Sequence, residues 1–147
     1  MDRETARRLV EAAPVGRLAT VTADGRPHAV PCCFALVGER VYSAVDGKPK
    51  STTVLKRLDN VRANPVATLL VDHYDDDWTR LWWVRLDGLA RIVDDAAERD
   101  TALDALAARY RQYRRDRPEG PMLALDIERW SGWSFDPAGP APATDSG

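Results

Sequence analysis

The chain has 147 residues, enough for one domain with a substantial core, and its 44% hydrophobic and 30% charged residues are typical of a soluble globular protein. A formal net charge of -2 and a pI near 5.7 argue against a general nucleic-acid binder but leave room for a local basic pocket. No apolar run approaches the ~20 residues of a membrane span, and the N-terminus MDRETARR is charged where a signal peptide is apolar, so we expect a cytoplasmic protein.

The first element is expected to be a helix over residues 2–13, with Asp2 as its N-cap and Pro14 at its end. Turn sequences at 23–26 (ADGR) and 38–39 (GE) then divide residues 15–45 into three strands of an antiparallel meander. Pro27 and Pro31 remove ladder donors from the second strand, which indicates a sheet edge, a bulge or backbone left free to meet a ligand.

The central stretch, DGKPKSTTVLKRLDNVRANP at 46–65, is predicted to hold a basic helix that Asn64-Pro65 ends. Val54, Leu55, Leu58 and Val61 make one apolar side of it. A polar stripe runs beside that side, formed by Lys50, Thr53, Arg57, Asn60 and Asn64. Such a stripe can hold an anion, and it can equally be a solvated helix face that keeps the protein soluble.

After this helix, VATLLVDHY at 66–74 is expected to form a strand, and the aspartates at 75–77 an exposed connection. Three consecutive carboxylates lack the alternating ligands of a calcium loop, so we interpret them as a solvated loop and expect no metal.

The next strand is expected in RLWWVRLDGLARIV at 80–93, where alternation places Trp82 in the core and Trp83, beside Arg85, on the opposite face. Trp83 is too large and apolar to sit in water, so its face should border a cleft or a second subunit. Gly88 interrupts the pattern and predicts a bulge that bends the strand, as closure of a barrel requires.

The last part of the chain predicts a helix over 95–113, in which Asp95 and Glu98 have capping-box spacing. MLALDIERW at 122–130 should be a further strand, and GWSF at 132–135 a short final one. The Pro-containing residues 136–147 are expected to be disordered, which leaves residues 1–135 as a single domain.

Recognisable catalytic motifs are absent from the sequence. His28 and His73 do not have metal-ligand spacing, and there is no GxSxG motif, P-loop or glycine-rich dinucleotide fingerprint. Cys32 and Cys33 are adjacent rather than in CxxC spacing, so we interpret them as small buried or cleft residues and not as a redox pair. No catalytic residue is assigned, and any hydride chemistry would need a cofactor on a scaffold other than a Rossmann domain.

Four segments in order carry a family resemblance: LATVTADGRPHAVPCCFAL, VYSAVDGKPK, LKRLDNVRANPVATLLVD and WWVRLDGLARIV. Over residues 15–93 the chain resembles the pyridoxamine 5′-phosphate oxidase-like split β-barrel superfamily, and within it most the actinobacterial-type deazaflavin enzymes that use coenzyme F420. The resemblance implies an α+β fold, a mainly antiparallel split β-barrel of about six strands with flanking helices. It also implies a homodimer with two cofactor sites at the subunit interface.

The resemblance further implies which residues bind the cofactor. Arg57, seven positions before Asn64, stands where the family has a basic residue on the cofactor phosphate. The strand after the DGRP turn borders the isoalloxazine-like ring, and the loop GKPKS supplies further phosphate contacts. These two segments contribute Pro31, Cys32, Cys33, Lys48, Lys50 and Ser51. Asn60 is included from the polar stripe. Trp78 and Trp83 are also expected at the cofactor site, where they suggest an aromatic wall suited to a planar partner.

Two departures from the family's FMN oxidases bear on the cofactor. Those enzymes carry an Arg and a Lys where this sequence has Val30 and Phe34, and the C-terminal Arg-x-His element of pyridoxal-phosphate recognition has no match here. We therefore expect an F420-dependent oxidoreductase that transfers a hydride to or from a planar conjugated small molecule. The alternatives are an FMN- or FAD-dependent enzyme on the same barrel and a non-catalytic cofactor-binding dimer.

Overall fold

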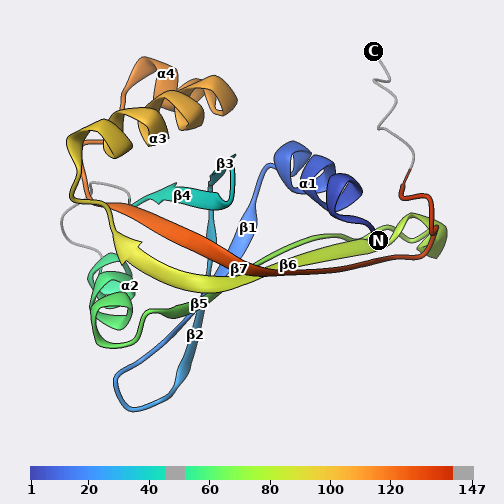
Figure 1. The fold of residues 1–147 in the computed structure, drawn as a ribbon, viewed down its shortest axis with the longest axis horizontal. Helices are drawn as coiled ribbons and strands as arrows, with labels where there is room; N and C mark the ends of the chain where they lie inside the picture. Colours follow the sequence, from blue (N-terminus) through green and yellow to red (C-terminus); the bar gives the residue numbers. More distant parts are fainter. Residues whose placement is uncertain (46–51, 141–147) are drawn as a thin grey trace.

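The computed structural model describes residues 1–45 and 52–140, with backbone alone for residues 52–55. Seven strands form one antiparallel sheet in the order β2-β1-β5-β6-β7-β4-β3, which curls into a half-barrel with helices around it (Figure 1), so the expected α+β split-barrel fold is confirmed. The strands are β1 (Gly16–Val21), β2 (Pro27–Cys32), β3 (Ala35–Val37), β4 (Arg40–Ala44), β5 (Val66–His73), β6 (Trp82–Ile92) and β7 (Met122–Ser134). The helices are α1 (Arg3–Ala12), α2 (Thr52–Ala63), the 3₁₀ turn η1 (Trp78–Arg80), α3 (Ala96–Arg109) and α4 (Arg111–Arg115).

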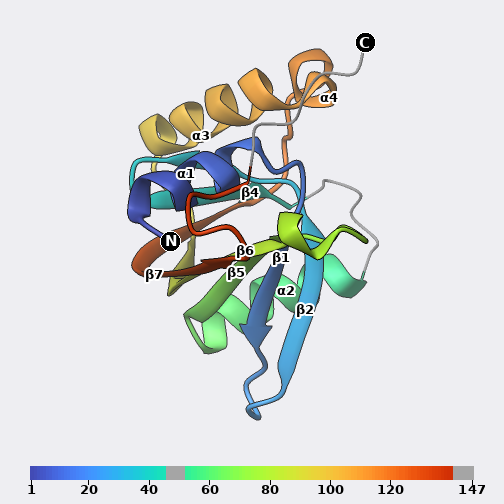
Figure 2. The same ribbon diagram turned by 90° about the vertical axis from the view of Figure 1, so that its right-hand side faces the viewer.

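The N-terminal helix forms as the sequence predicts. The Oδ1 atom of Asp2 accepts a 2.7 Å hydrogen bond from the backbone N–H of Thr5, which satisfies one of the orphan donors of the first turn. Its apolar side chains Ala6, Leu9 and Val10 are buried. In Figure 2, α1 lies under α3 at one end of the curled sheet, and α2 lies at the other end.

The predicted three-stranded meander is wrong, because residues 16–44 form two separate hairpins. β1 pairs with β2, whereas β3 pairs with β4, and β4 pairs with β7 on the far side of the sheet. Turn residues fix each hairpin locally, but they do not determine which edge of a sheet the next hairpin joins. β2 is left as an edge strand, and this agrees with the prolines at 27 and 31.

The strand β7 also differs from its prediction, since the two expected strands at 122–130 and 132–135 are one continuous element. The C-terminal part of β7 stays paired because the first residues of β6 run alongside it, with Val84 opposite Gly132 and Trp82 opposite Ser134. Trp82 is partly buried and packs against the core, while Val84 and Leu86 are fully buried.

The irregularity expected at Gly88 is present, as the register of β6 and β7 shifts between Asp87 and Gly88. A Cβ atom on Gly88 would lie 2.0 Å from the backbone oxygen of Asp126. Because this neighbour is backbone, it cannot move aside as a side chain would. The strands can therefore approach this closely only with glycine at position 88.

The helix expected over 95–113 is broken at Tyr110, whose extended backbone (φ -114°, ψ 121°) separates α3 from α4. The Tyr110 hydroxyl accepts a hydrogen bond from the N–H of Phe34 and lies 3.0 Å from the carbonyl oxygen of Pro14. The local sequence pattern would allow one continuous helix. The long-range contacts of the Tyr110 side chain explain why the helix is interrupted at this residue.

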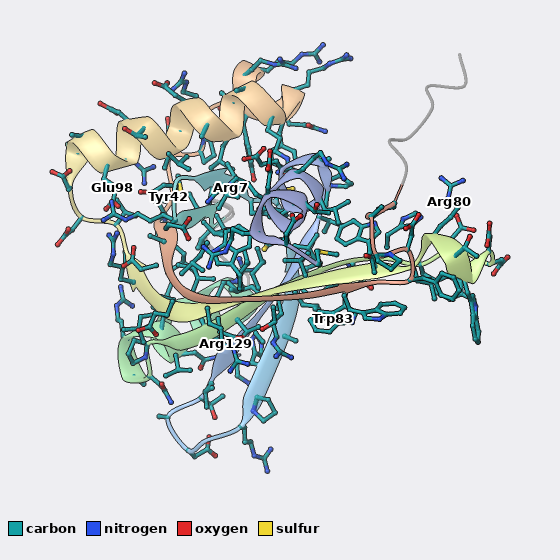
Figure 3. The ribbon with its side chains drawn as sticks, turned by 45° about the vertical axis from the view of Figure 1, so that its right-hand side comes forward. Arg7, Tyr42, Arg80, Trp83, Glu98 and Arg129 are labelled. Atoms are coloured by element: carbon teal, nitrogen blue, oxygen red, sulfur yellow. The ribbon has the colours of Figure 1, made fainter. Side chains whose placement is uncertain are left out.

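α3 is held on the sheet by a polar network as well as by a small core. The guanidinium of Arg91 donates two hydrogen bonds to the Glu98 carboxylate (2.6 and 2.8 Å) and two to Asp126 (2.8 and 3.1 Å). Tyr42 donates a further bond of 2.8 Å to Glu98 (Figure 3). These hydrogen bonds, foremost those from Arg91, lower the pKa of Glu98 from its usual 4.5 to about 2.

We expect Glu98→Gln to destabilise the protein by about 2 kcal/mol near neutral pH, because the ionised Glu98 carboxylate is more stable in the folded state than in the unfolded state. A lowered pKa stabilises the fold above pH 4.5, and this stabilisation is lost as the pH falls towards 2. The difference between wild type and variant in urea unfolding should therefore shrink over that interval. The exposed Glu119→Gln serves as the control, and a difference that does not vary with pH would contradict the assignment.

Gly88→Ala should cost about 3 kcal/mol or more, since the added methyl group meets backbone in a well-packed ladder. The matched control is Gly132→Ala in the same strand pair, where the nearest neighbour of the new Cβ is the flexible end of Met1 at 3.0 Å. Thermal unfolding of the two variants measures the contrast. Equal stability for both would mean that the close approach at Gly88 is not a constraint.

Candidate functional site

The candidate site lies where α2 packs on β1 and β6, next to the β2 strand that pairs with β1. Leu58 and Val61 of α2 belong to the same buried cluster as Val30 and Cys32 of β2. This packing turns the polar stripe of α2 inwards, so that Arg57 and Asn60 are 9% and 4% exposed. At these two positions the stripe is therefore not a solvated helix face.

Asn60 anchors α2 to the barrel. Its side-chain Nδ2 donates a 3.2 Å hydrogen bond to Oγ1 of Thr20 on β1, and both residues are buried. A buried amide without a partner would destabilise the fold, so this pair fixes how α2 sits on the sheet.

Arg57 lies one helical turn before Asn60, and its Nε has no hydrogen-bond partner although the atom is buried. Buried donors in proteins are nearly always paired, and an unpaired guanidinium nitrogen calls for an acceptor from outside the described residues. Arg57 is close enough to Cys32 for its charge to oppose the rise in the thiol pKa, but burial has the larger effect and raises the pKa of Cys32. Cys32 is therefore held as a neutral thiol beside a buried cation.

His28 is a further polar residue of this region, and the sequence reasoning considered it only as a metal ligand. Its Nδ1 atom is buried and has no partner. In the register of the β1–β2 hairpin His28 is opposite Thr20, the residue that Asn60 contacts. Alternation along β2 places His28 on the same face as Val30 and Cys32, and this period of two is the sequence signal that could have found it.

The strand end next to Arg57 combines buried and accessible groups. Pro31 and Cys33 are exposed, whereas Cys32 is buried, as opposite faces of a strand require. The carbonyl oxygen of Cys33 accepts a 2.9 Å hydrogen bond from Oγ of Ser43, and the guanidinium of Arg109 stacks 4.7 Å from the ring of Phe34. Lys48, Lys50 and Ser51, expected to contact the phosphate, lie outside the described residues.

Within a single copy of the protein, Trp78 and Trp83 lie away from this site. Both lie towards the start of β6, and α2 lies beside the opposite end of that strand (Figure 1). Trp78 is 65% exposed in η1, and Trp83 projects from the face of the sheet away from α1 (Figure 3), with the Arg85 guanidinium 5.5 Å from its ring. Of the residues named from the sequence, the structure therefore groups Pro31, Cys32, Cys33, Arg57 and Asn60.

Within residues 1–45 and 52–140 no cluster of three or more His, Cys, Asp or Glu side chains could hold a metal ion. Among the helices of those same residues, none is long and apolar enough to cross a membrane.

Comparison with known proteins identifies the fold family. A family profile described as pyridoxamine 5′-phosphate oxidase matches residues 2–134. No curated protein matches the sequence significantly.

Solved structures share the architecture at low sequence identity. The conserved hypothetical protein Rv2991 from Mycobacterium tuberculosis aligns with a TM-score of 0.77 and 18% identity, over 100% of this chain and 93% of that one. A FAD-binding protein from Mesorhizobium loti gives 0.67 and 24%, over 90% and 94% of the two chains. The heme storage protein HutZ from Vibrio cholerae gives 0.68 and 16%, over 90% and 93%. At these identities the likeness concerns the fold alone.

Proposed function

Because this chain belongs to the pyridoxamine 5′-phosphate oxidase family, we propose that it binds a phosphate-bearing flavin or deazaflavin cofactor and serves as an oxidoreductase for a planar conjugated small molecule. The observation that carries the proposal is the buried Arg57 guanidinium with its unpaired Nε. A phosphate group supplies the charge and the acceptor oxygens that such a nitrogen lacks.

In this proposal the chain's own residues bind and orient. Arg57 holds the phosphate, Asn60 keeps α2 in register through Thr20, and the accessible edge at Pro31 and Cys33 borders the ring system. The cofactor itself supplies the hydride chemistry when it is bound. Cys32 takes no part as a nucleophile, since burial raises the pKa of its thiol and keeps it protonated.

Coenzyme F420 is the first candidate for the cofactor. Val30 and Phe34, which stand where the FMN oxidases carry charged residues, are buried in the core with exposures of 9% and 0%. They offer the cofactor no charge, and the anion must be held mainly from α2 and its neighbourhood. FMN or FAD is the second candidate, favoured by the likeness to FAD-binding proteins from Mesorhizobium loti and Mycobacterium smegmatis.

We further propose a homodimer, formed through the outer face of the sheet. Trp83 of β6 is directly opposite Trp133 of β7, and Val66, Leu70, Leu89 and Trp133 are all more than a third exposed on the same side of their strands. Arg85, Asp87 and Arg129 lie on this face between the tryptophan pair and the aliphatic residues, so the exposed apolar surface forms two patches. Exposed apolar patches are costly in water, and a second copy of the same face would cover both. Such a dimer could also bring the aromatic residues of one copy to the site of the other.

Arg57→Ala should weaken cofactor binding by about 10- to 150-fold, because a charge-assisted hydrogen bond contributes roughly 1.5–3 kcal/mol. Fluorescence titrations with F420, FMN and FAD measure the effect and also rank the three cofactors. The matched control is Arg62→Ala on the same helix, where the side chain is exposed and pairs with Asp59 at 3.6 Å. Equal affinity of wild type and Arg57→Ala for the preferred cofactor would refute the phosphate role.

Light scattering at micromolar concentration tests the dimer. We expect wild type to be dimeric, and Trp133→Arg to be mainly monomeric because it places a charge in the exposed tryptophan pair of the outer face. Gln112→Arg on the exposed α4 is the control for added charge. A wild type that is monomeric and still binds its cofactor would exclude a shared site.

A further inference from the structure

A separate groove lies between α1 and the neighbouring ends of β5 and β6. Its volume is about 450 Å³, within the range of roughly 300–1,000 Å³ that is common for small-molecule sites. Figure 3 shows Arg80, which lines the groove, on the α1 side of the sheet, while Trp83 projects from the other side. The groove is therefore distinct from the outer face assigned to the dimer.

The two walls of the groove differ in chemistry. One wall is aliphatic and comes from α1 and the residues that follow it: Leu9, Ala12, Ala13 and Pro14. The other wall is aromatic, since His73 and Trp82 are direct cross-strand neighbours and their rings are stacked with centroids 6.5 Å apart and an interplanar angle of 20°. A flat ring can pack between an aliphatic and an aromatic wall with contact on both of its faces.

The carboxylates beside the groove have cationic partners of their own. Asp72 pairs with Arg17 at 2.9 Å, and Asp75 is shared by Arg80 at 3.5 Å and His73 at 3.6 Å. Both carboxylates are thus compensated locally. Arg8 lines the groove, and its charge acts on the Asp2 carboxylate. No hydrogen bond or ion pair within 4 Å joins Arg8 to a residue that the structure describes, so its guanidinium can still receive an anion.

We infer that this groove binds a planar aromatic carboxylate, with the ring between the two walls and the carboxylate on Arg8. The wall chemistry selects a flat ring system, and the volume accommodates a bicyclic one. The single unpaired guanidinium selects one negative charge rather than a polyanion. The inference uses neither Arg57 nor a cofactor, so it can fail or hold independently of the proposed function.

Isothermal titration calorimetry of the intact protein with 2-naphthoate tests this site, with the uncharged 2-naphthylmethanol as the matched ligand. Wild type should bind 2-naphthoate about 10-fold more tightly than 2-naphthylmethanol. Arg8→Gln should remove this preference and leave the affinity for the alcohol unchanged. Arg129→Gln, an exposed arginine on the far side of the sheet (Figure 3), should bind both ligands as wild type does.

A second variant tests the aromatic wall without relying on charge. His73→Ala should weaken both ligands to a similar degree, because it removes half of the stacked wall. Circular dichroism confirms that each variant is folded before titration. The inference is overturned if wild type binds neither ligand, if Arg8→Gln keeps the preference for the acid, or if Arg57→Ala lowers 2-naphthoate affinity as much as Arg8→Gln does.

Discussion

The pairing of β6 with β7 is the interaction on which the rest of the structure depends. In the sheet order, β2, β1 and β5 lie on the β6 side, and β4 and β3 lie on the β7 side, so this ladder is the join between the two parts. The close approach at Gly88, where even a methyl group would clash with the backbone of Asp126, sets how the two strands cross. The register shift there changes which residues of β7 face inwards, from Leu125 before it to Trp130 after it. The bulge thus curls the sheet, and the curl creates an interior that α2 can close.

Two buried or half-buried arginines differ in how far the contacts of the chain explain them. Arg91 donates four hydrogen bonds to two carboxylates, and its position is fully explained by holding α3 on the sheet. Arg57 is more deeply buried than Arg91, yet its Nε meets no acceptor. A purely structural core would not favour a desolvated guanidinium Nε without an acceptor, because its burial costs free energy that no described residue returns. The same reasoning extends to the unpaired Nδ1 of His28 on the facing hairpin.

The sequence predicted what depends on local chemistry. Asp2 at the start of α1, the stop before Pro65 and the irregularity at Gly88 are each fixed by one or two residues, and each is present. The errors concern long-range order: the hairpin β3–β4 leaves β2 and joins β7, and the helix breaks at Tyr110 to reach Phe34. For the site, the helical period found the apolar side and the polar stripe of α2, but it could not tell a buried stripe from an exposed one. That distinction is set by packing against β1 and β6, which are distant in sequence from α2.

The consecutive residues Trp82 and Trp83 show how one strand can separate two surfaces. Alternation along β6 turns Trp82 towards α1, where it stacks with His73, and turns Trp83 to the outer face opposite Trp133. A slip of one residue in the register of β6 would exchange the two indoles and also expose Val84 and Leu86, which are fully buried. The core therefore fixes the register, and the register in turn assigns each tryptophan to its surface. A groove beside α1 and a tryptophan pair on the outer face can in this way arise from neighbouring residues without competing for the same side chain.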